Sequence, residues 1–226
     1  TVGIMAVGMT FILIVKEIDL SVGAIYAITG MATGMLLLAG WSVWLAVAAG
    51  LLIGAICGFV NGLLSTYGRI PSFIATLGMS STIRGIALLM TQGNPVTINE
   101  RAGVSPEMLK TFFFIGQGKL FGMVPMQFVC FVLIILAGSF LLSKTTFGFK
   151  IYASGGSEKA ATIAGVDVNR IKISAFVLMG ILAGVSGILG MSFLPSGQAG
   201  RTGLGMELDV IAAVVIGGTS MSGGEG

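Results

Sequence analysis

Residues Phe147–Lys172 read FGFKIYASGGSEKAATIAGVDVNRIK and separate two long apolar runs, Phe121–Leu142 and Ile173–Leu194. Together with Lys144 just upstream, this stretch holds five of the chain's twelve Lys and Arg residues. A positively charged segment of this length between apolar spans is typical of the cytoplasmic face of a membrane protein. We therefore expect a cytoplasmic loop over residues 143–172, between two membrane-spanning helices.

The same stretch carries the signals of one short helix. Gly155-Gly156 interrupts the preceding structure, the Ser157 hydroxyl can cap free N–H groups, and Glu158 suits the positive end of a helix dipole. Lys159–Ala164 favours helix, and Gly165 suits a left-handed C-terminal cap. A helix of about two turns is unstable alone in water, which makes it a candidate docking element. A plain positive loop with one helical turn would show the same signals, so both interpretations stay open at this point.

The composition excludes a soluble globular protein. Of the 226 residues, 55% are hydrophobic and only 9% are charged, whereas soluble domains are about 25% charged. The mean hydropathy is +1.02. We expect an all-α fold, a polytopic membrane helix bundle in contact with the lipid bilayer. The net charge of +3 is spread over loops, so we expect no nucleic-acid partner.

Apolar runs predict the order of the spans. They are Val2–Val15, Val22–Ala39, Val43–Leu64, Pro71–Met90, Phe121–Leu142, Ile173–Leu194 and Leu208–Gly218, with a polar segment at Thr91–Lys119. About 20 residues are needed to cross the hydrocarbon, so the first and last runs are too short alone. We expect residues 1–226 to form a single transmembrane domain that is truncated at both ends. Interruptions near residues 16–21 and 205–218 predict broken or re-entrant segments, whose backbone groups must face protein or a water-filled cavity.

The distribution of positive charge predicts the orientation. Alternating sides assign seven Lys and Arg residues to the cytoplasm, on segments 16–20, 65–70 and 143–172. The opposite side has four, on segments 40–42, 91–120 and 195–206. This bias has the direction expected for cytoplasmic loops. It predicts a cytoplasmic loop at 143–172 and an extracytoplasmic loop at 91–120.

Small residues recur at helical spacing within the apolar runs. They are Ala46, Gly50, Gly54, Gly58 and Gly62 in the third run, Gly30 and Gly34 in the second, and Gly180 and Gly184 in the sixth. Such faces allow helix backbones to approach closely in a membrane, where no hydrophobic effect draws helices together. The pattern predicts a compact bundle and indicates nothing about a solute.

Seven polar residues lie in or beside apolar runs and are candidates to line a polar pathway. They are Asp19, Ser21, Asn61, Ser81, Arg84, Glu207 and Asp209. Polar groups are unfavourable in hydrocarbon and usually face a cavity or a partner. For the acids, a position at the membrane surface with the carboxylate in water is equally compatible with the sequence. Both Glu17-Ile18-Asp19 and Glu207-Leu208-Asp209 lead into an apolar run, which hints at internal pseudo-symmetry.

Signals of enzymatic chemistry are missing from the sequence. No histidine is present, which removes the commonest general base and metal ligand. Cys57 and Cys130 lie inside apolar runs, where they are expected to pack rather than to form a disulfide. No phosphate-binding loop occurs, and the terminal GGEG lacks the required lysine. We expect no catalytic residue, no metal site and no cofactor in this chain; any ATP would be hydrolysed by a partner subunit.

Four motifs in this order resemble the ribose-type sugar ABC transporter permease family. They are Glu17–Gly23 (EIDLSVG), Ile70–Met79 (IPSFIATLGM) followed by Arg84-Gly85, the loop Gly148–Lys172, and Gly203–Gly224. The resemblance covers nearly the whole chain except the segment Asn94–Pro125. Two departures stand out: Lys16-Glu17 replaces small residues, and Arg201–Met206 replaces a plainer small-residue turn.

The resemblance implies the membrane-spanning permease subunit of an ATP-driven monosaccharide importer, for a solute of the ribose, pentose or hexose type. It implies four kinds of neighbour: a second permease chain in a homo- or heterodimer, cytoplasmic ATP-binding subunits, an extracytoplasmic sugar-binding protein and the lipid of a bacterial plasma (inner) membrane. It further implies that the short helix docks on the ATPase. The residues expected in this coupling are Gly155, Gly156, Ser157, Glu158, Lys159, Ala160, Ala161 and Gly165.

Two other classes of function remain open from the sequence. A proton- or ion-coupled secondary transporter of a small polar solute could use Asp19 and Asp209 as relay groups. A membrane scaffold that moves no solute would have the same composition. Sensitivity of uptake to a protonophore, without dependence on a nucleotide-binding partner, would favour the secondary transporter.

Overall fold

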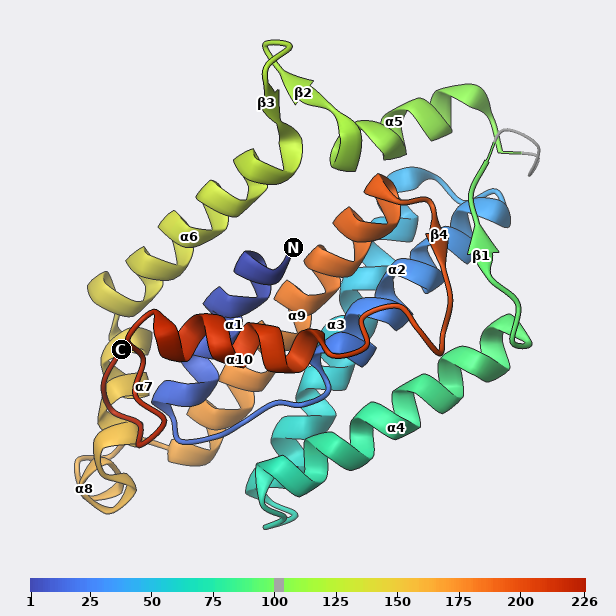
Figure 1. Cartoon of the computed structure of the whole chain (residues 1–226). Coiled ribbons are helices and arrows are strands. Elements are labelled where there is room, and N and C mark those ends of the chain that lie inside the picture. The colour runs from blue at the N-terminus through green and yellow to red at the C-terminus, as the bar shows by residue number, and fades with distance from the viewer. Residues whose placement is uncertain (100–103) are drawn as a thin grey trace.

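The computed structural model describes residues 1–99 and 104–226, and over these residues the chain is almost entirely helical (Figure 1). In chain order the elements are α1 (Val2–Ile14), α2 (Val22–Leu38), α3 (Val43–Thr66), α4 (Ser72–Thr91), β1 (Val96–Thr97), α5 (Pro106–Gln117), β2 (Lys119–Leu120), β3 (Val124–Pro125), α6 (Met126–Lys144), α7 (Thr146–Gly156), α8 (Glu158–Ile163), α9 (Val168–Phe193), β4 (Ser196–Gly197) and α10 (Met206–Ile216). Among the described residues, α3, α4, α6 and α9 are long and apolar enough to cross a membrane, and α1 and α2 are shorter apolar helices. The predicted all-α membrane bundle is confirmed.

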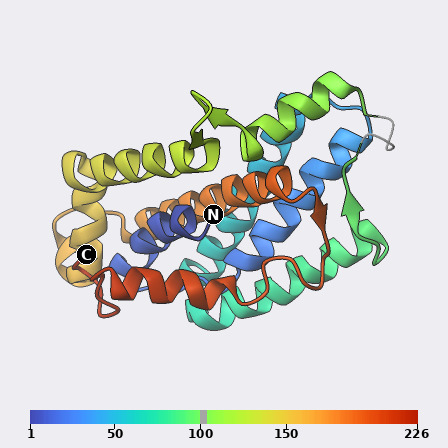
Figure 2. The same ribbon diagram turned by 45° about the horizontal axis from the view of Figure 1, so that its top comes forward.

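Helix α9 lies at the centre of the bundle and packs against α1, α2, α3 and α5. Its contact with α3 follows from the glycine pattern. A Cβ atom on Gly54 would overlap with the Gly180 carbonyl oxygen, and one on Gly58 would overlap with the Phe176 carbonyl oxygen. The two backbones can approach this closely only because side chains are absent there. In both views α4 and α6 lie along opposite sides of the bundle (Figure 2), and Gly138 is the only buried residue of α6.

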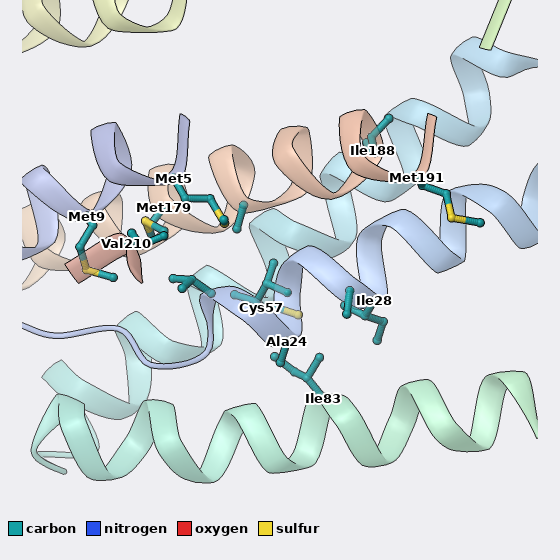
Figure 3. Packing of buried hydrophobic residues seen from close by; sticks show 14 of the residues in the cluster. Met5, Met9, Ala24, Ile28, Cys57, Ile83, Met179, Ile188, Met191 and Val210 are labelled. Carbon is teal, nitrogen blue, oxygen red and sulfur yellow. The ribbon is translucent and has the colours of Figure 1, made fainter. Parts of the chain in front are cut away.

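The core is continuous from α1 to the far end of α9. Figure 3 shows Met5 and Met9 of α1 beside Met179 of α9 and Val210 of α10. The same cluster continues through other buried side chains to Ile188 and Met191 near the end of α9. Unbranched methionine side chains fill the irregular spaces between helices that cross at different angles. The interior therefore links the short helices α1 and α10 to the long helix α9.

Two interruptions divide the chain into short helices. Residues 15–21 between α1 and α2 are not helical, and Lys16 adopts a left-handed backbone with φ of 61°. We call residues 15–21 the α1–α2 break. The second interruption lies at residues 194–205, and the short segment expected near 205–218 is present as α10, a continuous helix from Met206 to Ile216. Gly203 and Gly205, with φ of 70° and 82°, turn the chain into α10.

The predicted loop 91–120 contains structure that the hydropathy pattern does not reveal. Helix α5 begins at a Ser105 cap and buries Phe112 against the bundle. The Gln117 side-chain amide donates hydrogen bonds to the last carbonyl groups of α9, those of Ser192 and Phe193, at 3.2 and 3.1 Å. Strand β1 pairs with β4 in antiparallel register, so loop 91–120 lies beside residues 195–206. Arg101, one of the cations counted for loop 91–120, is outside the described residues.

Three boundaries differ from the hydropathy prediction around the basic loop. Helix α6 begins at Met126 rather than Phe121, because β2 and β3 form a hairpin over residues 119–125. Helix α9 begins at Val168 rather than Ile173, because the Asp167 carboxylate caps the Arg170 N–H at 3.1 Å. Helix α7 occupies the first part of the basic loop and ends at Gly156. The basic loop is therefore two short helices and the start of a long one.

Candidate functional site

Three of the seven pathway candidates form one buried hydrogen-bond network, which we call the Asp19 cluster: Asp19, Ser21 and Asn61. Asp19 Oδ1 accepts hydrogen bonds from the Ser21 N–H at 2.8 Å, from Ser21 Oγ at 2.6 Å and from Asn61 Nδ2 at 3.5 Å. Asn61 Nδ2 also donates to Ser21 Oγ at 2.8 Å. All three residues are fully buried. The cluster joins the α1–α2 break to the C-terminal part of α3, across about 40 residues of sequence.

The backbone of the break is supported by two hydroxyl groups of α4. Ser72 Oγ accepts from the Ile18 N–H at 3.1 Å, and Thr76 Oγ1 accepts from the Leu20 N–H at 3.0 Å. Non-helical backbone within a membrane bundle must find such partners inside the protein. Sequence reasoning did not single out Ser72 or Thr76. Their spacing of four residues near the start of a span, on one helical face, was the signal available.

Two oxygen atoms of the Asp19 cluster lack a partner. Asp19 Oδ2 and Asn61 Oδ1 are buried and form no hydrogen bond in the described part of the chain. Both are acceptors that can receive hydrogen bonds from hydroxyl groups or water. Because a buried polar atom without a partner is unfavourable, these two oxygens are the atoms of the cluster that are ready to bind a donor.

The second interruption meets the first turn of α2, directly after the α1–α2 break. Gly23 in the first turn of α2 lies against the backbone of Gly203, and a side chain on either residue would overlap with the other. A Cβ on Gly23 would also lie 2.7 Å from Glu207 Oε2. The half-buried Glu207 carboxylate therefore lies at the start of α2, and its Oε2 has no hydrogen-bond partner among the described residues.

The remaining candidates lie outside this meeting point. Arg84 Nη1 donates to the carbonyl oxygens of Ala199 and Thr202 at 3.3 and 3.1 Å, so it holds the second interruption on α4. Ser81 is exposed, and its hydroxyl donates to the Leu77 carbonyl oxygen of its own helix at 3.4 Å. Asp209 is exposed on α10. The acid-x-acid repeat has no structural equivalence, because Glu17 and Asp19 precede a helix whereas Glu207 and Asp209 lie in the first turn of one.

Replacement of Arg84 by methionine is expected to loosen residues 198–205. Hydrogen bonds from a charged group contribute about 1.5–3 kcal/mol, so amide hydrogen exchange in this segment should become roughly tenfold faster. Hydrogen–deuterium exchange with mass spectrometry on the detergent-solubilised protein measures this. Arg201→Met is the control, because Arg201 is exposed in the same segment. Equal exchange in the Arg84→Met variant and the unaltered chain would contradict the assigned role.

A cavity of about 230 Å³ lies between α2, α9 and the second interruption. Its lining includes Tyr26 and Met31 of α2, Gly187 and Gly190 of α9, and Thr202 and Gly203. The tyrosine ring borders the space, and its hydroxyl group packs against Gly190. Tyr26 of α2 therefore lies between α9 and the second interruption.

The predicted short helix is present as α8, and its caps are those that the sequence indicates. Ser157 Oγ accepts from the Ala160 N–H at 3.3 Å, and Gly165 has a φ of 83°. Ala161 is the buried residue of α8, whereas Lys159 and Ala160 are exposed. The helix is thus anchored by one small side chain and presents its remaining surface outward.

The residues on either side of α8 connect it to the α1–α2 break. Gly155 packs directly against the Ile14 carbonyl oxygen, where a Cβ atom would overlap. Lys16 Nζ donates to the Gly156 carbonyl oxygen at 3.4 Å. Glu158 forms an ion pair with Lys172 at 2.6 Å. The coupling candidates and the first interruption therefore lie at the same end of the bundle.

Metal-ligating side chains do not gather in the described part of the chain. Among the described residues, no group of three or more His, Cys, Asp or Glu side chains could hold a metal ion. The thiols of Cys57 and Cys130 are free. The carboxylate, amide and hydroxyl groups of the Asp19 cluster form hydrogen bonds with one another.

Comparison with known proteins gives a consistent set of relatives. Residues 1–224 match the family described as "Branched-chain amino acid transport system / permease component". A ribose import permease protein of Escherichia coli (strain K12) is 41% identical over 223 residues, covering 99% of this chain and 67% of the relative. The ribose import permease protein of Bacillus subtilis (strain 168) is 42% identical over 225 residues, with the same two coverages. No solved structure matches the chain.

A further relative transports a different sugar according to its name. An L-arabinose ABC transporter permease protein of Azospirillum brasilense is 40% identical over 223 residues, covering 99% of this chain and 62% of the relative. The chain thus spans about two-thirds of the length of these relatives. With four helices able to span a membrane and a family match over residues 1–224, the chain belongs to this family of multi-pass membrane permease components and is similar to its ribose and L-arabinose permeases.

Proposed function

We propose that this chain is the core of the membrane subunit of an ATP-driven importer for a monosaccharide, and that α8 is the contact with the ATP-binding subunit. The observation that carries the proposal is that α8 is short, capped and exposes an apolar side chain. It is a capped helix of six residues, too short to be stable alone, and it presents an 89% exposed Ile163 at its tip. An apolar side chain held outward on a preformed helix suits a pocket on a partner protein.

The surface around Ile163 supports the same role. A shallow groove over α8 is lined by Glu158, Lys159, Thr162 and Ile163. It combines one apolar side chain with a carboxylate, an ammonium group and a hydroxyl. Mixed surfaces of this kind, with an apolar centre and a polar rim, are typical of protein–protein contacts. We infer that cytoplasmic ATP-binding subunits bind here, which places loop 143–172 in the cytoplasm and loop 91–120 outside.

For the solute, the chemistry of the Asp19 cluster favours a polyhydroxyl compound over an amino acid. The cluster offers unpaired acceptor oxygens at Asp19 and Asn61, which suit hydroxyl donors. An amino acid would also need a cationic partner for its carboxylate, and the Asp19 cluster itself contains no cationic side chain; Arg84 lies at the second interruption, where Nη1 binds backbone carbonyl groups and Nη2 has no partner among the described residues. The names of the relatives support a ribose-like or arabinose-like sugar.

The assembly follows from the same proposal. We infer that a second permease chain, identical or related, pairs with this one, and that an extracytoplasmic sugar-binding protein delivers the solute. We further infer that the assembly lies in a bacterial inner membrane. The pathway residues that we propose are the Asp19 cluster together with Glu207, since the cluster lies at the α1–α2 break and the Glu207 carboxylate lies beside Gly23 at the start of α2. Ser81 and Asp209, both exposed, lie outside this proposed set.

Replacement of Ile163 by aspartate is expected to abolish binding of the ATP-binding subunit while leaving the fold intact. Ile163 is 89% exposed, so the bundle loses no packing, whereas an apolar pocket on the partner would have to bury an unpaired charge. The test uses the full-length protein, expressed with its cognate ATP-binding subunit, and measures co-purification and ATP-dependent uptake of labelled ribose in proteoliposomes.

Met123→Asp is the matched control for this experiment. Met123 is an 80% exposed apolar residue in the turn between β2 and β3, away from α8 in Figure 1. We expect this variant to retain the ATP-binding subunit. Retention of the subunit by the Ile163→Asp variant, at the level of the control, would refute the docking role of α8.

The alternative of a proton- or ion-coupled transporter predicts a different result. It relies on Asp19 and Asp209 as relay groups, but Asp19 is buried in its cluster and Asp209 is exposed on α10. Uptake by the permease alone, abolished by a protonophore and independent of ATP, would establish this alternative in place of the importer.

A further inference from the structure

Lys172 connects α8 itself to the α1–α2 break, in addition to the Lys16–Gly156 hydrogen bond just before α8. Lys172 lies near the start of α9, and its Nζ is 2.6 Å from Glu17 Oε1 and 2.6 Å from Glu158 Oε1. Glu17 belongs to the break and Glu158 to the first turn of α8. The three residues therefore come from three different segments: the α1–α2 break, α8 and α9. We call them the Lys172 bridge.

The two ion pairs of the bridge differ in exposure. The side chains of Lys172 and Glu17 are both 12% exposed, whereas that of Glu158 is 52% exposed. Water and salt screen an exposed pair strongly and a shielded pair much less. The Lys172–Glu17 contact is therefore the more persistent of the two. The Lys172–Glu158 contact is the one that can break and reform when α8 moves.

The break is the part of the structure that can respond to this lysine. The end of α1 is held firmly, because the Ile14 carbonyl oxygen accepts from the Gly224 N–H at 2.9 Å and Gly155 packs against the same atom. Beyond it the chain is not helical, and Asp19 follows Glu17 by two residues. A displacement of Glu17 would therefore move the non-helical segment that carries Asp19 and Ser21, rather than the end of α1.

We propose that Lys172 is a positioning residue that transmits movement of α8 to the α1–α2 break and so to the Asp19 cluster. The proposal rests on the proposed function, because an ATP-binding subunit must move α8. The mechanical path runs from Glu158 through Lys172 to Glu17 by direct contacts, and then along two residues of backbone to the buried carboxylate. Coupling between separate sites needs such a contiguous element with two arrangements.

Removal of the lysine charge tests the bridge. Lys172→Met keeps the length of the side chain and leaves two carboxylates without a shared cation. We expect the ATP-binding subunit to stay bound and to hydrolyse ATP, while the number of ribose molecules imported per ATP falls roughly tenfold. Lys172→Arg, which keeps the charge, should recover most of the loss. The measurement uses the full-length permease with its ATP-binding subunit and binding protein in proteoliposomes.

A matched control lies two residues away on the same helix. Arg170 forms an ion pair with Asp167, in which the side chains are 82% and 51% exposed. Arg170→Met therefore removes a cation from the same end of α9 without touching the bridge, and the ratio of sugar to ATP should stay at the wild-type value. A wild-type ratio in the Lys172→Met variant would overturn the proposal.

Two glutamine variants keep the test decisive if Lys172→Met does not fold. Glu17→Gln removes the shielded pair, and Glu158→Gln removes the exposed one. We expect the larger loss of sugar per ATP from Glu17→Gln, because Glu17 joins the bridge to the break. An unchanged ratio for Glu17→Gln would overturn the bridge. Failure of the proposed function would be recognised separately, because the unaltered complex would then show no ATP-dependent uptake.

Discussion

Replacement of Gly54 by valine is expected to prevent the chain from reaching its folded state. Gly54 and Gly180 lie where α3 crosses α9, and a Cβ atom on either would overlap with the carbonyl oxygen of the other. Because the obstacles are helical backbone rather than flexible side chains, the helices would have to separate. The expected loss of stability is therefore at or above the upper end of the ~1–3 kcal/mol that overpacking usually costs.

Gly78→Val is the matched control for this prediction. Gly78 lies in the long apolar helix α4, and a Cβ atom there would meet no other atom within 4 Å. Both variants would be extracted in a mild detergent and compared by size-exclusion chromatography and by thermal unfolding. We expect aggregation for Gly54→Val and wild-type recovery for Gly78→Val. A monodisperse Gly54→Val variant with an unchanged unfolding midpoint would show that the helices do not pack at these glycines.

Replacement of Asn61 by leucine is expected to disable the Asp19 cluster. Leucine has a similar size but donates no hydrogen bond, so Ser21 Oγ loses its 2.8 Å donor and the buried Asp19 carboxylate loses another. Leaving buried groups short of a partner costs about 1–3 kcal/mol. Uptake should fall roughly tenfold or more, since about 1.4 kcal/mol corresponds to a factor of ten.

Ser65→Ala provides the comparison on the same helix. Ser65 lies one turn beyond Asn61, and its Oγ is buried without a partner within the described residues. Removing an unpaired hydroxyl should leave stability unchanged or slightly raised. Thermal unfolding of both variants and initial rates of ATP-dependent ribose uptake measure the effects. Equal behaviour of the two variants would show that the Asp19 cluster contributes nothing to stability or transport.

Hydropathy predicts the long helices well because their signal is local. The run Val43–Leu64 appears as α3 at Val43–Thr66, and the run Pro71–Met90 appears as α4 at Ser72–Thr91. Helices α5 and α7 were missed for a related reason. Their apolar residues are fewer and lie in charged or polar segments, and both depend on packing against α9. Helix α9 lies beyond both helices in the sequence, so a local stretch of residues does not reveal this packing.

The candidate site was predicted residue by residue but not as an arrangement. Asp19, Ser21 and Asn61 stood out separately as polar residues in apolar surroundings. The supporting residues Ser72 and Lys172 did not, because hydroxyl groups and lysines near the ends of spans are ordinary. Their contacts with the break join positions 54 and 155 residues apart. Such separations carry no periodic signal in a single sequence.

The sequence by itself determined which segments enter the membrane, where the short helix α8 begins and ends, and which polar residues need an explanation. These properties depend on the hydrophobicity and capping of neighbouring residues, which the order of amino acids contains directly. Only the tertiary structure decided that the second interruption meets the start of α2 at Gly23 and Gly203 and that Lys172 joins α8 to the α1–α2 break. The packing that brings these distant residues together depends on glycines at which helix backbones approach closely, as Gly30 of α2 does against Gly187 of α9 and Gly54 of α3 does against Gly180 of α9.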